Sequence, residues 1–98
     1  MLKKLLNNYL DNYYTNKFIE YISRQIRFRF NLDIEVKKYK NGMVDINAKP
    51  THFNKFTHLL EFHKGDSLNH LVSLRDIETE LVIEKINDLN KTDEWKKI

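Results

Sequence analysis

The chain lacks cysteine and holds only two glycines and one proline among its 98 residues. Without cysteine, disulfide scaffolds, thiolate zinc sites and cysteine nucleophiles are excluded. Because Gly42 and Gly65 are the only glycines, the chain cannot form a glycine-rich phosphate loop or a dinucleotide-binding fingerprint. The longest apolar run is Leu81–Ile83, which is far too short to cross a bilayer. We therefore expect a cytoplasmic protein that does not contact a membrane.

The residues that are present suit one small globular domain. Aliphatic and aromatic residues make up 41% of the chain and charged residues 32%, and a chain of this length typically forms a single domain. We expect residues 1–98 to form that domain, with a loosely packed polar tail over about residues 90–98. Lysine, asparagine and isoleucine supply a third of the chain. Their AT-rich codons favour a low-GC bacterium, a phage or a mobile element as the source.

The apolar periodicity predicts a helix followed by a strand. Near the N-terminus, apolar side chains recur at helical spacing, at Leu2, Leu6, Tyr9 and Tyr13. This spacing predicts an amphipathic helix over about residues 2–23, continuous or interrupted at Thr15 or Asn16. From Ile26 to Val36 every second residue is apolar, which predicts a strand with one buried and one solvated face.

Asn41 and Gly42 predict a hairpin turn that leads into a second strand, which ends at Pro50. A three-residue loop over residues 40–42, with Gly42 left-handed, keeps the apolar residues of both strands on one face. It also places opposite charges across from each other on the other face. In this register Tyr39 pairs with Met43, Val36 with Ile46, Ile34 with Ala48, Lys37 with Asp45, and Asp33 with Lys49.

The hairpin leaves residues 26–32 without a partner strand, so the backbone groups of that edge need another strand to pair with. A third strand over Asn69–Leu74, a second copy of the chain or a target protein would each supply this strand. Two further helices are predicted, over Thr51–Gly65 and from Ser73 to about Leu89. The predicted fold class is α+β: an N-terminal helix, an antiparallel hairpin with or without a third strand, and two C-terminal helices covering one sheet face.

Basic residues are concentrated in the first half of the chain, which contains ten lysines and arginines but only five acidic residues. On the predicted strands they would lie on the solvated face and at the hairpin tip. The candidate binding residues are Arg24, Arg27, Arg29, Lys37, Lys38, Tyr39 and Lys40. The leading hypothesis is therefore a non-enzymatic protein that contacts nucleic-acid phosphates through this basic ribbon.

The alternative hypothesis is a phage-type inhibitor or adaptor that binds a host protein or nucleoprotein, as anti-CRISPR proteins do. Strand addition along Ile26–Leu32 would provide the contact, and the same edge could close a homodimer. Trp95 stands in a polar tail, so it is either an interface anchor or a lid that folds back onto the core.

The remaining residues point to neither catalysis nor a cofactor. No serine lies in a nucleophile turn. The four histidines, at positions 52, 58, 63 and 70, lack the i, i+4 pairing of helical two-histidine zinc sites. His58 and Glu61 form an i, i+3 pair, but two ligands make a poor site. We therefore expect a protein that is not an enzyme and holds no metal or cofactor.

Overall fold

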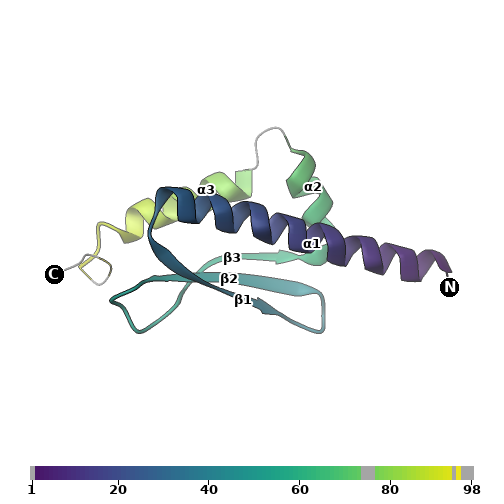
Figure 1. Ribbon diagram of the computed structural model, residues 1–98, viewed down its shortest axis with the longest axis horizontal. Helices are drawn as coiled ribbons and strands as arrows, with labels where there is room; N and C mark the ends of the chain where they lie inside the picture. The colour runs from purple at the N-terminus through teal and green to yellow at the C-terminus, as the bar shows by residue number, and fades with distance from the viewer. Residues whose placement is uncertain (1, 74–76, 94, 96–98) are drawn as a thin grey trace.

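The computed structural model describes the backbone of residues 2–73, 77–93 and 95, and the side chains of these residues from Leu6 onward. A long helix begins the chain, three antiparallel strands follow, and helices end it, so the predicted α+β class is confirmed (Figure 1). The elements are α1 (Leu2–Arg29), β1 (Leu32–Lys38), β2 (Met43–Pro50), β3 (Thr57–His63), the 3-10 helix η1 (Lys64–Asp66), α2 (Ser67–Val72) and α3 (Ile77–Leu89).

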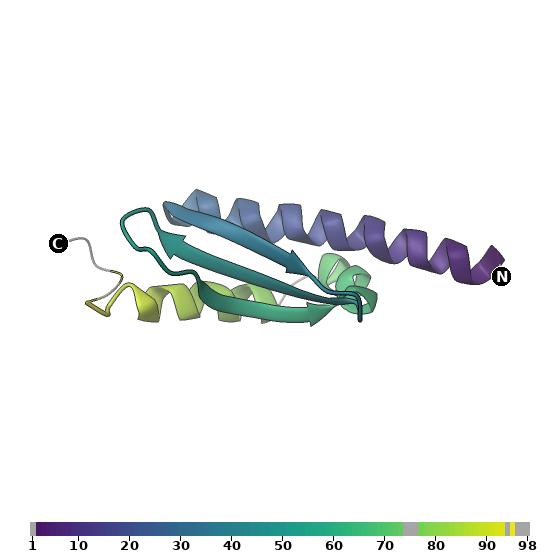
Figure 2. The same cartoon turned by 90° about the horizontal axis from the view of Figure 1, so that it is seen from below.

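The strands form one sheet in the order β1-β2-β3, and the helices lie on one of its faces. Figure 2 shows the sheet from the face opposite the helices, and none of the described helices crosses in front of it. The molecule therefore has two layers, with α1 running beside β1 and α3 beside β3. The second face of the sheet, termed the open face, carries no helix among the described residues.

The hairpin between β1 and β2 has the predicted register at every position. The amide of Tyr39 donates to the Met43 carbonyl at 2.9 Å, and the amide of Gly42 donates to the Tyr39 carbonyl at 3.1 Å. Gly42 has a φ of 89°, the left-handed conformation that this loop requires. The pairs Val36–Ile46, Ile34–Ala48, Lys37–Asp45 and Asp33–Lys49 all form.

The predicted strand over Ile26–Val36 is wrong in its first part, because α1 continues to Arg29. Ile26 satisfies both periodicities, since it also extends the helical row of Phe18 and Ile22, and all three are fully buried. The amide of Phe30 donates to the Ile26 carbonyl at 2.8 Å and closes the last helical turn. Tertiary packing of this row therefore outweighs the strand pattern.

The buried face of α1 also differs from the predicted one. Thr15, Phe18, Ile22 and Ile26 point into the protein, and the helix runs through Thr15 and Asn16 without interruption. The apolar residues expected on the inner face of its first half are exposed, at Leu6, Tyr9 and Tyr13. The reason is that the first turns of α1 extend beyond the end of the sheet (Figure 1), so no strand lies beneath them.

The predicted helix over Thr51–Gly65 is a strand, β3, which pairs with β2. A β-bulge explains the error: Ile46 pairs with Leu60 and Asn47 with His58, so Leu59 is the extra residue. Leu59 and Leu60 are both buried, and two adjacent inward leucines also fit a helical pattern. The third strand expected over Asn69–Leu74 is likewise wrong, because residues 69–72 belong to α2 and Leu74 lies outside the described residues.

The packing of the C-terminal part differs from the prediction in both directions: α3 buries fewer of its apolar residues, and Trp95 of the tail is buried. Val82 and Ile86 of α3 are buried, but Ile77 and Leu81, expected on the same inner face, are exposed. Trp95 is only 4% exposed and joins the core cluster, so it folds back onto the domain as a lid. Residues 74–76 of the predicted helix and residues 94 and 96–98 of the predicted tail lie outside the described part of the chain.

Candidate functional site

The structure distributes the predicted basic residues over three places instead of one ribbon. Arg24, Arg27 and Arg29 are helical residues of α1, so the prediction that Arg27 and Arg29 lie on the solvated sheet face is wrong. Arg24 and Arg27 line a groove beside β1. Arg29 lies in a separate hollow with His52 and Trp95.

Lys37, Lys38, Tyr39 and Lys40 stay together at the hairpin tip, where several of them have acidic or amide partners. The ammonium of Lys38 donates to Asn16 Oδ1 at 2.7 Å, and that of Lys37 lies 3.7 Å from Glu35 Oε1. The Tyr39 hydroxyl donates to Asp45 Oδ2 at 3.0 Å, and this hydrogen bond raises the pKa of Tyr39 above its usual value. Among these contacts, the one with Glu35 compensates a positive charge at the tip, that of Lys37.

The groove beside β1 is a concave surface that two of the basic residues share with apolar side chains. It has a volume of about 650 Å³ and runs between α1 and the inner face of β1. Its lining consists of Ile19, Glu20, Ser23, Arg24, Arg27, Phe28, Ile34 and Val36. Phe28 is 88% exposed, although an aromatic ring of this size normally finds cover.

The outer edge of β1 borders the same groove, and its backbone has no strand partner within the described residues. Hydrogen-bonded and non-hydrogen-bonded pairs alternate along an antiparallel ladder. Because the Tyr39–Met43 pair is hydrogen-bonded, Lys37 and Glu35 bond to β2, whereas the peptide groups of Val36 and Ile34 face outward. The two residues whose side chains line the groove therefore also present the free backbone groups. The strand edge predicted over Ile26–Leu32 is wrong in position, since Ile26–Arg29 is helical.

Charge in the groove is positive on balance. Arg24 and Arg27 stand on the α1 wall. The carboxylate of Glu20, on the same wall, lies 3.9 Å from the ammonium of Lys17. This ion pair leaves the two guanidinium groups as the dominant charge of the groove.

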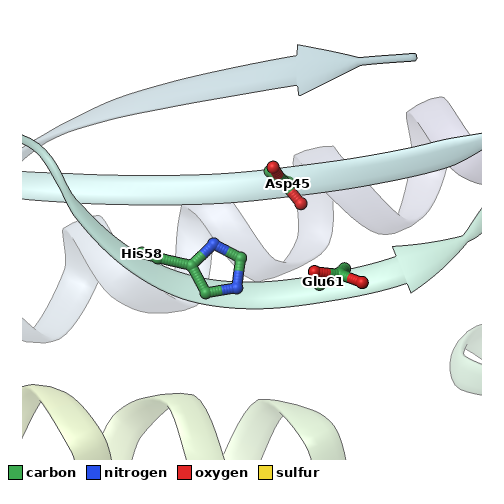
Figure 3. Close-up of side chains that lie close together, drawn as sticks. All are labelled: Asp45, His58 and Glu61. Carbon is green, nitrogen blue, oxygen red and sulfur yellow. The ribbon is translucent and has the colours of Figure 1, made fainter.

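A second cluster lies on the open face of the sheet. Asp45 of β2 and His58 and Glu61 of β3 each turn a ligand atom toward the others, and these atoms all lie within 4.8 Å of one another (Figure 3). His58 and Glu61 lie in the segment predicted to be a helix, where they form an i, i+3 pair. Residue spacing does not point to Asp45, because it joins the pair only through the pairing of β2 with β3.

No family model, curated protein or solved structure matches this chain. Among the described helices, none is both long enough and apolar enough to cross a bilayer.

Proposed function

We propose that this protein is a non-enzymatic binding module that takes up an extended, acidic segment of a partner protein along the outer edge of β1. The observation that carries the proposal is that Ile34 and Val36 combine two features. Their side chains line the groove, and their backbone N–H and C=O groups have no strand partner among the described residues. A strand added to this edge would form hydrogen bonds with these two residues. Its alternate side chains would enter the groove, where the exposed ring of Phe28 can cover them.

The charge of the groove supports an acidic partner. Arg24 and Arg27 would each pair with a carboxylate in two parallel hydrogen bonds, the geometry that guanidinium groups favour. An inhibitor or adaptor that binds a host protein, the phage-type role expected as an alternative from the sequence, would act through such a contact. Nucleic-acid binding through a basic ribbon has less support, because the arginines and the hairpin lysines lie in separate places.

The experiment uses displayed random ten-residue peptides selected on the full chain. We expect the selected peptides to alternate apolar residues with other residues and to contain aspartate or glutamate. Affinity is then measured by fluorescence anisotropy of one labelled consensus peptide. Arg24→Glu and Arg27→Glu should each weaken binding at least about tenfold, since each replaces an attraction for a peptide carboxylate with a repulsion. Lys85→Glu, an exposed charge reversal on α3, is the matched control and should not change the affinity.

Backbone pairing is tested by Val36→Pro, which removes an outward-facing amide without breaking the β1–β2 ladder. This variant should keep the fold by circular dichroism and lose peptide binding. The proposal is wrong if the selection yields no peptide, or if Arg24→Glu and Lys85→Glu have equal effects. Salt-dependent binding of a 20-base-pair duplex by a chain that selects no peptide would favour the nucleic-acid hypothesis instead.

A further inference from the structure

Two carboxylates face each other across the open side of the sheet. Asp45 and Glu61 are direct cross-strand partners. Because Asp45 bonds to β1, its pair with Glu61 is a non-hydrogen-bonded one, in which side chains come closest. Like charges directly opposite each other destabilise a sheet. A cation between these two carboxylates would convert the repulsion into attraction.

The bulge at Leu59 adds a nitrogen ligand to this pair. In a regular strand, residues that share a face are an even number apart, so residues 58 and 61 would point to opposite faces. The extra residue Leu59 changes the alternation of side chains between the two faces by one position. His58 and Glu61 therefore both lie on the open face (Figure 3). Bulges that redirect a side chain in this way are common next to functional sites.

Two residues outside the cluster fix the orientation of the imidazole. Asn47 Nδ2 donates to Glu35 Oε1 at 3.2 Å, so the amide oxygen Oδ1 of Asn47 is turned toward β3. That oxygen lies 3.3 Å from His58 Nδ1 and can only accept, so Nδ1 carries the proton. The lone pair of the neutral ring is then on Nε2. Histidines that bind metals typically have this arrangement, with one ring nitrogen held by a carbonyl and the other free for the ion.

We propose that Asp45, His58 and Glu61 form a binding site for a divalent transition-metal ion, with Zn²⁺ as the best match. One imidazole nitrogen and two carboxylate oxygens are ligands that Zn²⁺ accepts, and three protein ligands leave a fourth position for water. Asp45 keeps Oδ1 for the ion while Oδ2 accepts from the Tyr39 hydroxyl. The ion would link β2 to β3 on the open face, whereas the groove is lined by residues of α1 and β1.

The test is isothermal titration calorimetry of ZnCl₂ into the untagged full chain. We expect one ion to bind per chain. His58→Gln and Glu61→Gln replace exposed side chains, so both variants should fold, and each should weaken Zn²⁺ binding by more than tenfold. Asn47→Ala removes only the orienting residue, so we expect a smaller loss of about 10-fold. His52→Gln, an exposed histidine in the loop between β2 and β3, is the matched control and should bind like the wild type.

Nuclear magnetic resonance provides a second readout, because Zn²⁺ should shift the imidazole signals of His58 more than those of the other histidines. Unchanged affinity in His58→Gln, loss of binding in His52→Gln, or no measurable Zn²⁺ binding by the wild type would each overturn the proposal. These results are independent of the peptide selection, since the ligands do not line the groove.

Discussion

Phe18 and Phe62 meet edge to face, with ring centroids 5.0 Å apart and ring planes at 89°, and this contact joins α1 to β3. His70 of α2 stacks on Phe18, at 4.7 Å between ring centroids, and its ring centroid also lies 5.9 Å from that of Phe62. Phe18 is therefore the point where three elements meet, and it is fully buried.

Phe18→Ala should lower the free energy of unfolding by about 3–5 kcal/mol, because it leaves a cavity at this junction. The control is Phe28→Ala on the same helix, where the ring is 88% exposed. That substitution should change stability by less than about 0.5 kcal/mol and should weaken peptide binding instead. Urea denaturation measures both stabilities. Similar losses in the two variants would contradict the burial pattern of α1.

Gly42→Ala should destabilise the hairpin for two reasons. A left-handed conformation costs a residue other than glycine about 1–3 kcal/mol, and the φ of Gly42 is 89°. In addition, an added Cβ would lie 2.6 Å from Nε2 of His63. Gly65→Ala is the comparison, because that position has no positive φ and its nearest contact is 3.2 Å. Thermal denaturation should show the larger loss for Gly42→Ala, and the reverse order would rule out this turn geometry.

The joint between α1 and α2 contains a buried pair of hydroxyls. Thr15 Oγ1 donates to the Asp11 carbonyl at 2.6 Å and lies 2.9 Å from Ser67 Oγ, so the Ser67 hydroxyl donates to Thr15. Thr15→Val leaves Ser67 without this acceptor and should cost about 1–3 kcal/mol. Adding Ser67→Ala should recover part of the loss. A double-mutant cycle by chemical denaturation measures the coupling, and strict additivity would mean that the two hydroxyls do not interact.

Local signals were enough to predict the hairpin. Gly42 fixes the turn, and the alternation from Ile34 to Val36 and from Val44 to Ala48 then allows one register only. The predicted ion pair of Asp33 with Lys49 forms at 3.2 Å. The ammonium of Lys37, however, lies 3.7 Å from Glu35 of its own strand, while Asp45 accepts a hydrogen bond from the Tyr39 hydroxyl.

The errors arose where one pattern fits two structures. Ile26 continues both a strand alternation and the helical row of Phe18 and Ile22, and only packing against the sheet decides between them. The bulge at Leu59 made β3 look helical. Both candidate sites depend on these two places, since the groove needs Arg24 and Arg27 on a helix, and the metal cluster needs His58 on a strand. Neither site could be predicted from residue spacing alone.

The most direct test of the open β1 edge is amide hydrogen exchange of the free protein, residue by residue, by nuclear magnetic resonance. Glu35 and Lys37 bond to β2, so their amides should exchange slowly, whereas the outward amides of Ile34 and Val36 should exchange fast. Addition of the consensus peptide should then slow the hydrogen exchange of the Ile34 and Val36 amides and leave that of Glu35 and Lys37 unchanged. Equal protection of all four amides in the free protein would show that the edge is already covered, and would contradict the proposed binding mode.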